Sequence, residues 1–297
     1  MSPELIPYLA DRCKIVDKAL RSYLPSAKTR PATVHDAMRY SVFAGGKRLR
    51  PILCLAAAEA CDGDYEAALP PAGAVECIHT YSLIHDDLPC MDDDDLRRGQ
   101  PTSHVKYGEG IAVLAGDALL TIAFEILAKV KPTKRYDIGS FVTELATCAG
   151  SKHLIGGQVL DLEGEGSDVL LNPAQLKYIH QSKTAALLTS SIRLGAMTAN
   201  ATPARIEALT IYGQSLGLAF QVIDDILDVT QTSEKLGKSA GKDEATNKST
   251  YPALFGLEKS RKEAARLTKK AHEALKPFGK KGDRLHEIVD YLLDRDY

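Results

Sequence analysis

The stretch from Ala204 to Val229, ARIEALTIYGQSLGLAFQVIDDILDV, decides the fold class. Its apolar and small residues recur at helical spacing and surround most of the circumference of a helix, rather than forming one stripe. Helices of this kind are usually enclosed by other helices. Residues 71–85 and 111–130 have the same character, so we expect each of them to be a central helix.

The rest of the chain supports the same fold class. Clusters of Gly, Pro and polar residues divide it into about ten helical segments. Alternating strand patterns are nearly absent, and the sequence contains no repeat, low-complexity tract or long linker. The simplest architecture is therefore a single all-α domain that spans residues 1–297.

The composition excludes several classes of protein. The chain has 297 residues, with 37 Lys plus Arg against 39 Asp plus Glu, so it lacks the basic field of a nucleic-acid or anionic-membrane binder. Its six cysteines are scattered without a C-x-x-C pair, which indicates reduced thiols. The N-terminus does not read as a signal peptide, and we expect a cytoplasmic protein without a membrane span.

The first segment that indicates chemistry is Asp86–Gly99, DDLPCMDDDDLRRG. An isolated acidic run is usually a solvated loop. Here Asp86 and Asp87 directly follow the apolar run that ends at His85, so they emerge from a buried helix, where unpaired carboxylates would be costly. These two residues therefore need a cation.

The second segment is Phe220–Asp228, FQVIDDILD, where acids interrupt an otherwise apolar helix. Asp224 and Asp228 lie one helical turn apart, separated by about 40° around the axis, so both carboxylates project from one face. Asp86 and Asp92 would lie on different faces of a regular helix, so Pro89 must distort or end the helix between them.

Two facing aspartate clusters suit Mg²⁺, which binds a few carboxylates, keeps waters and completes its octahedron with phosphate oxygens. The implied substrate is a diphosphate, and a departing diphosphate needs cationic side chains nearby. Arg97 and Arg98 follow the first cluster, and GGKRLRP at residues 45–51 is a glycine-rich turn with three further cations. Other candidates, each more often a surface lysine, are Lys183, Lys238 and Lys248.

Taken together, these segments resemble the trans-prenyltransferase family, and most closely the bacterial farnesyl diphosphate synthases. The matching stretches cover nearly the whole chain and include Gly156-Gly157-Gln158 and Lys183-Thr184. The resemblance implies a homodimer in which each chain is a single polyprenyl synthetase domain. It also implies a helical bundle around a central cavity and two or three Mg²⁺ ions per active site.

The resemblance assigns roles to individual residues. The metal would be held by Asp86, Asp87, Asp92, Asp224, Asp225 and Asp228, and all of these except Asp228 would be catalytic together with Lys183. Isopentenyl diphosphate would be bound by Lys47, Arg50, His79 and Arg98. The allylic diphosphate, dimethylallyl or geranyl, would be bound by Arg97, Lys183, Thr184, Gln221, Lys238 and Lys248.

Product length should be set below the first cluster. Ser82 lies one turn before Asp86 on the same face, with Tyr81 beside it. These two residues should therefore form the floor of the pocket that holds the growing chain. In the family, an aromatic residue at the place of Tyr81 goes with a farnesyl product, which predicts a C15 product here. The alternative is that Tyr81 only packs against a neighbouring helix.

Three other readings stay open. A geranylgeranyl diphosphate synthase differs only near Tyr81. A terpene cyclase uses similar chemistry but needs aromatic walls for its carbocations, and this chain has no Trp and only six Phe. A non-catalytic prenyltransferase subunit typically lacks some of the aspartates, all of which are present here.

Overall fold

The computed structural model describes residues 3–164, 171–230 and 249–293. Most of these described residues lie in helices. Within the described residues, strand is confined to a short antiparallel hairpin of β1 (Leu96–Arg97) and β2 (Gln100–Pro101), in which Leu96 lies opposite Pro101. The all-α prediction is confirmed.

The chain divides into two compact units. The N-terminal unit contains Ile6–Leu145 and Leu194–Ala201, and the C-terminal unit contains Met1–Leu5, Ala146–Arg193 and Thr202–Tyr297. The prediction of a single domain around a central cavity remains a prediction.

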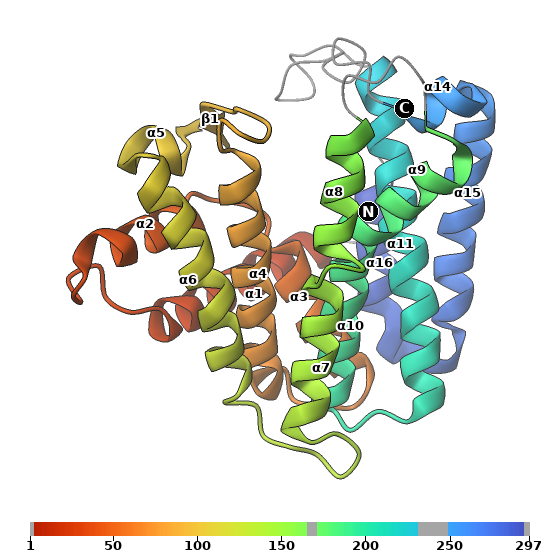
Figure 1. Ribbon diagram of the computed structural model, residues 1–297. Coiled ribbons are helices and arrows are strands. Elements are labelled where there is room, and N and C mark those ends of the chain that lie inside the picture. The colour runs from red at the N-terminus through yellow and green to blue at the C-terminus, as the bar shows by residue number, and fades with distance from the viewer. Residues whose placement is uncertain (1–2, 165–170, 231–248, 294–297) are drawn as a thin grey trace. The chain divides into compact units, whose positions relative to one another are not determined.

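In the N-terminal unit, α4 (Leu69–Asp86) and α6 (Glu109–Leu127) run side by side (Figure 1). Proline occupies the first turn of α4, where a missing N–H group costs nothing. Small residues then let α4 be buried on nearly all sides, as predicted for residues 71–85. The other elements are α1 (Leu5–Tyr23), α2 (Ala32–Val42), α3 (Leu49–Ala60), η1 (Tyr65–Ala68), α5 (Ser103–Tyr107) and most of α7 (Ile138–Ala149).

The prediction that residues 111–130 form an enclosed helix was wrong for one face of α6. Ala112, Ala115 and Leu119 are buried, but Val113 and Leu114 are 38% and 55% exposed. Composition shows that a face is apolar, but not whether this chain covers it. Among the described helices, α6 alone is long and apolar enough to cross a membrane, a criterion that core helices of soluble proteins also meet.

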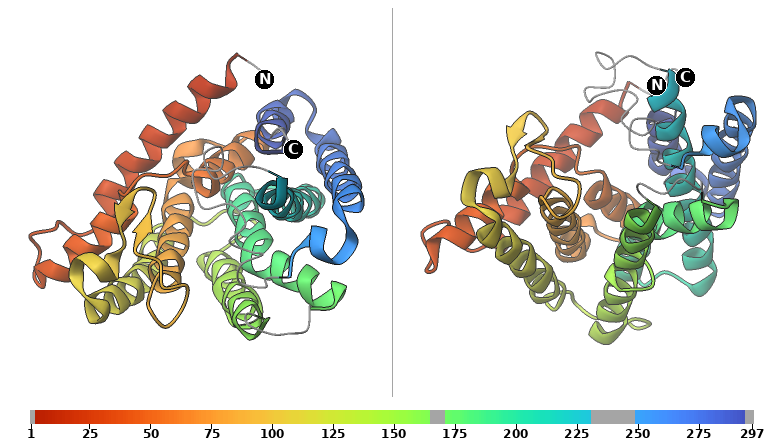
Figure 2. Two further views of the ribbon diagram at one scale, coloured as in Figure 1. Left: turned by 90° about the horizontal axis from the view of Figure 1, so that it is seen from above. Right: turned by 45° about the horizontal axis from the view of Figure 1, so that its top comes forward.

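In the C-terminal unit, α11 (Pro203–Thr230) packs along α15 (Leu257–Ala274) (Figure 2). Most of α11 is buried, as its sequence predicted. The buried Tyr212 hydroxyl donates to the carbonyl of Leu285 at 2.9 Å and so ties α11 to α16. The remaining elements are α8 (Leu154–Gly164), α9 (Pro173–Ile179), η2 (His180–Ala185), α10 (Ala186–Thr198), α14 (Tyr251–Phe255), η3 (Lys276–Gly282) and α16 (Asp283–Leu293).

Close packing of α10 on α3 in the N-terminal unit requires a glycine. A Cβ atom on Gly195 would lie 1.9 Å from the carbonyl oxygen of Cys54. The oxygen belongs to the backbone of α3 and the Cβ position is fixed by the backbone of α10, so neither can yield without moving a helix.

We therefore expect Gly195→Ala to lower the free energy of unfolding by about 1–3 kcal/mol, as overpacked cores do. The matched control is Gly110→Ala in α6, where a Cβ would meet nothing within 4 Å. That variant should be neutral or more stable by up to about 1 kcal/mol, because alanine is the better helix former. Urea denaturation of both variants checks this, and similar midpoints would contradict the packing argument.

Candidate active site

The first aspartate cluster lies in a loop that folds back on the end of α4. The helix ends at Asp86, as the position of Pro89 predicted. The Asp92 N–H then donates to the Asp86 carbonyl at 2.8 Å, and the Asp93 N–H donates to the Leu88 carbonyl at 3.1 Å. The backbones of Asp86 and Asp92 are thereby brought together, which a regular helix could not do.

Asp87 is paired with Arg97. The carboxylate is 3% exposed and accepts from Arg97 Nε at 2.8 Å on both oxygens, and from Nη2 at 2.5 Å. Burial raises the pKa of Asp87, and the Arg97 hydrogen bonds offset part of that rise. The pair fastens the end of α4 to β1. The metal role of Asp87 and the diphosphate role of Arg97 remain predictions.

Three of the four residues predicted to bind isopentenyl diphosphate form a cationic cluster. Arg50 Nη1 lies 3.2 Å from Nε2 of His79, and Arg98 donates to the carbonyl of Gly45. Burial, followed by the charges of Arg50 and Arg98, lowers the pKa of His79 well below its usual value. His79 is therefore neutral at physiological pH and accepts from Arg50. Lys47 is exposed on the same loop.

Arg48, which the sequence left without a role, holds that loop in place. It is 4% exposed and has a left-handed backbone, with φ of 49°. Its guanidinium donates to Asp17 and Glu76, each at 2.8 Å, and to the carbonyl of Val42 at 2.6 Å. Neighbouring residues in a tight turn point in different directions, so the sequence could not show which of the three cations turns inward.

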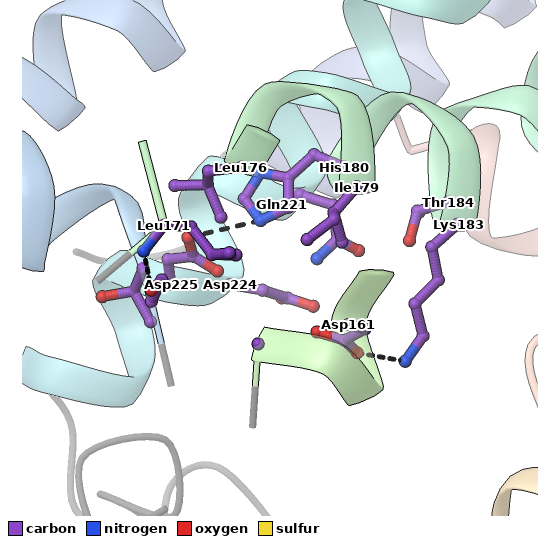
Figure 3. A pocket seen from close by; sticks show the side chains of 13 residues that line it. Asp161, Leu171, Leu176, Ile179, His180, Lys183, Thr184, Gln221, Asp224 and Asp225 are labelled. Atoms are coloured by element: carbon purple, nitrogen blue, oxygen red, sulfur yellow. Dashed lines mark hydrogen bonds and ion pairs between the residues drawn. The ribbon is translucent and has the colours of Figure 1, made fainter. Parts of the chain in front are cut away.

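The second site is a cavity of about 200 Å³ in the C-terminal unit (Figure 3). Its polar lining includes Asp161, Lys183, Thr184, Gln221 and Asp224, so it contains three of the six predicted allylic-diphosphate residues. Lys183 Nζ donates to Asp161 Oδ2 at 2.6 Å, and Asp161 is 7% exposed. The sequence analysis missed Asp161. The available signal was an acid in the largely apolar helix α8.

The backbone that carries Lys183 and Thr184 is unusual. The η2 segment is a π-helix, a wider turn that often marks functional sites. It also approaches α8 very closely, because a Cβ on Gly157 would lie 2.5 Å from the Lys183 backbone nitrogen. Gly157 thus allows Lys183 to reach Asp161. This packing is a structural role for the Gly156-Gly157-Gln158 stretch.

The other residues of the second cluster are buried. Asp225 also lines the cavity and is 7% exposed, whereas Asp228 is 5% exposed and is not among the lining residues. Lys238 and Lys248 lie outside the described residues. The expectation that the two aspartate clusters share Mg²⁺ concerns residues of different units and remains a prediction.

The donor set of each cluster fits Mg²⁺ that is bound together with a phosphate. Every candidate ligand is a carboxylate, the oxygen donor that Mg²⁺ prefers. In residues 3–164, 171–230 and 249–293, no three His, Cys, Asp or Glu side chains converge as a complete cage. An open carboxylate pair that relies on water and phosphate for its other ligands is the usual Mg²⁺ arrangement.

The chain-length candidates lie on α4 below Asp86. Tyr81 is 6% exposed, and its ring meets His85 edge-on at 5.7 Å between centroids. His85 Nε2 in turn lies 3.0 Å from the Val113 carbonyl of α6. Ser82 is half-buried and donates to the His79 carbonyl at 3.0 Å. The Tyr81 ring is therefore held in position, and its role as the floor remains a prediction.

The lowered pKa of His79 predicts a pH effect on stability. The unfolded chain binds a proton at this residue below about pH 6.5, but the folded protein resists binding it until lower pH. Stability should therefore fall as pH falls below about 6.5, by at most about 1.4 kcal/mol per pH unit from this residue. His79→Gln, whose amide oxygen can still accept from Arg50, should show a shallower fall.

Urea denaturation between pH 5 and 8 measures both slopes, and pH 8 is the internal reference, at which neither state protonates residue 79. Equal slopes below pH 6.5 would show that His79 is protonated in the folded protein.

Comparison with known proteins agrees with this geometry. The profile of the polyprenyl synthetase family matches residues 31–292. The chain is 49% identical to "Heterodimeric geranylgeranyl pyrophosphate synthase large subunit 1, chloroplastic" of Arabidopsis thaliana, over 93% of this chain and 75% of that protein. It is 46% identical to the geranylgeranyl diphosphate synthase of Cyanophora paradoxa, over 98% and 97% of the two chains.

A solved structure of an FPP/GFPP synthase from Zymomonas mobilis matches with a TM-score of 0.89 at 37% identity, over 99% of this chain and 100% of that one. The family profile and the relatives together cover nearly the whole chain. The protein therefore belongs to the polyprenyl synthetase family, all-α prenyltransferases of isoprenoid biosynthesis that generally use Mg²⁺ with diphosphate substrates.

Proposed function

We propose that this protein is a Mg²⁺-dependent prenyltransferase that condenses isopentenyl diphosphate with dimethylallyl and then geranyl diphosphate to give (2E,6E)-farnesyl diphosphate. The observation that carries the proposal is that the predicted site residues form two groups of different charge balance. In the first group, Arg50 and Arg98 lie near neutral His79. Lys183 and Thr184 share a cavity with aspartates that suit a metal-bound diphosphate.

In this mechanism the side chains bind and orient both substrates, and none acts as a nucleophile. Mg²⁺ bound with the allylic diphosphate would neutralise the charge that develops on it as it leaves. The allylic C–O bond breaks, and its electron pair leaves with the diphosphate, which Lys183 and Thr184 hold. The double bond of isopentenyl diphosphate, held by Arg50 and Arg98, attacks the allylic cation. Loss of a proton to the departed diphosphate restores a double bond.

Tyr81 supports the C15 product. A helical turn rises about 5.4 Å, close to the length of one isoprene unit, so a fixed ring just over one turn below Asp86 should stop growth early. The names of the relatives favour a second candidate, because several are geranylgeranyl diphosphate synthases. The same chemistry with a deeper pocket would give that C20 product.

Two other readings have less support. Terpene cyclases guide carbocations with aromatic walls, and the side chains that line the described cavity are aliphatic, polar or charged except for His180. A non-catalytic subunit would be expected to lack some of the aspartates, yet both clusters keep all of theirs.

The proposal predicts the products of a defined reaction. With Mg²⁺ and isopentenyl diphosphate, the protein should convert dimethylallyl and geranyl diphosphate to a C15 product and should not extend farnesyl diphosphate. Tyr81→Ala should release the stop and give C20 or longer chains. Chromatography of the dephosphorylated alcohols identifies each product.

Tyr81→Phe is the matched control, because it keeps the ring and should keep the C15 product. A C20 product from the unmodified protein would favour the geranylgeranyl synthase. Unchanged products in Tyr81→Ala would remove Tyr81 as the floor. No elongation with any primer would favour a cyclase or an inactive subunit.

We further propose that the protein forms a homodimer through the exposed face of α6. Val113 and Leu114 form an apolar surface on a helix whose other face is buried in the N-terminal unit. Soluble proteins rarely leave such surfaces uncovered. One of the relatives is named as a subunit of a heterodimer, so a different partner chain is the alternative occupant.

Leu114→Asp should therefore shift the protein from dimer to monomer at micromolar concentration, because a buried unpaired carboxylate is costly. Sedimentation velocity measures the change. Ile6→Asp is the control, since Ile6 is similarly exposed, at 48%, but lies on α1. A Leu114→Asp dimer that is as stable as the unmodified one would exclude this face.

A further inference from the structure

The two adjacent acids of the second cluster have different surroundings. Asp224 and Asp225 both line the cavity, but Asp224 is partly exposed, whereas Asp225 is 7% exposed. Adjacent residues on a helix project about 100° apart, so both cannot face one ligand equally. The difference suggests that the two acids have different functions.

Asp225 fixes a distant part of the chain. Its Oδ2 accepts from the backbone N–H of Tyr251, 26 residues further on, at 2.9 Å. That N–H belongs to the first residue of α14, which has no partner for it within the helix. A hydrogen bond from an amide to a buried carboxylate is among the stronger ones in a protein. Burial, followed by the charges of Glu263 and Asp225, raises the pKa of Tyr251.

The same oxygen also faces His180 (Figure 3). His180 Nε2 lies 3.7 Å from Asp225 Oδ2, and the ring stacks on Tyr251 with centroids 5.6 Å apart and planes at 24°. The Tyr251 ring also packs against Phe255, with ring centroids 5.2 Å apart. Asp225, His180 and Tyr251 thus form one buried cluster that joins α11, η2 and α14.

Asp225 and His180 line the same cavity as Lys183 and Thr184, which contact substrate in the proposed function. His180 is the first residue of η2, the π-helix that carries Lys183 and Thr184 into the cavity. A π-helix is rare and occurs mostly as a single turn inside an α-helix, so tertiary contacts must support it. The contacts of His180 with Asp225 and Tyr251 provide such support.

We propose that Asp225 is a positioning residue rather than a metal ligand: by holding Tyr251 and His180, it sets the placement of Lys183 and Thr184 relative to Asp224. The inference rests on the proposed function in one respect, which is that Lys183 and Thr184 bind the allylic diphosphate. The anchor itself does not depend on the reaction.

The first test uses the metal-free protein and hydrogen exchange of the Tyr251 amide, followed by NMR or residue-resolved mass spectrometry. Asp225→Ala removes the acceptor and should speed exchange at Tyr251 by about tenfold or more. Asp225→Asn keeps a carbonyl acceptor and should stay close to the unmodified protein. Asp224→Ala is the control on the neighbouring residue and should leave this amide unchanged. An unchanged Tyr251 amide in Asp225→Ala would overturn the anchor.

The second test separates positioning from metal binding by kinetics. Asp225→Asn should keep the Mg²⁺ dependence of the unmodified protein, and any loss should appear in KM for the allylic diphosphate. Asp224→Asn, which alters a ligand, should lose turnover by about 10²-fold or more or require much more Mg²⁺. His180→Phe retains the stacking on Tyr251 but removes the nitrogen, and it should raise KM for the allylic diphosphate without changing the Mg²⁺ dependence.

Equal changes in Mg²⁺ dependence for Asp225→Asn and Asp224→Asn would make Asp225 a ligand and overturn the proposal. An unmodified protein that elongates no primer would instead overturn the proposed function, and the amide exchange at Tyr251 would still test the anchor.

Discussion

The buried guanidinium of Arg48 is the interaction on which the cationic site depends. A buried charge is tolerated only when nearly all of its hydrogen-bonding capacity is used, and Arg48 is bound by Asp17, Glu76 and the Val42 carbonyl. These bonds connect the loop at residues 45–50 to α1 and α4. With the loop fixed, Arg50 meets His79 and Arg98 reaches Gly45. The cations are thus arranged before any anion arrives, which is what preorganised electrostatic binding requires.

The same principle operates in the C-terminal unit with opposite charges. Asp161 is buried and is compensated by Lys183, while Asp225 is buried and compensated by the Tyr251 amide and the nearby His180. Each acid therefore fixes an element that borders the cavity. Asp161 also holds the Lys183 ammonium in place at the cavity. In the proposed function, the allylic diphosphate would replace Asp161 as the anionic partner of Lys183.

The two units differ in the charged side chains that they contribute. The N-terminal unit contains the first aspartate cluster and also neutral His79 near arginines, and the group around His79 suits an anion that is bound without a metal. The C-terminal unit contributes carboxylates beside one lysine, a site that favours an anion with a metal. In the proposed function, this difference in charge balance supports distinct roles for the two substrates. The allylic substrate must lose its diphosphate group, whereas isopentenyl diphosphate must keep its diphosphate group. In the proposed function, Tyr81, which is held against His85, limits the length of the product.

The sequence by itself determined the fold class, the central positions of α4 and α11, and the types of residue at both sites. These properties are local: helical periodicity, a proline that ends a helix after Asp86, and acids within apolar runs can all be read from neighbouring residues. Only the tertiary structure decided which charge meets which partner. The pairs Asp87–Arg97 and Asp161–Lys183 join different elements, as does Asp225–Tyr251, and the exposed face of α6 has the same composition as a buried one. Such contacts depend on how helices pack, because adjacent side chains point in different directions and only their surroundings decide which one faces inward.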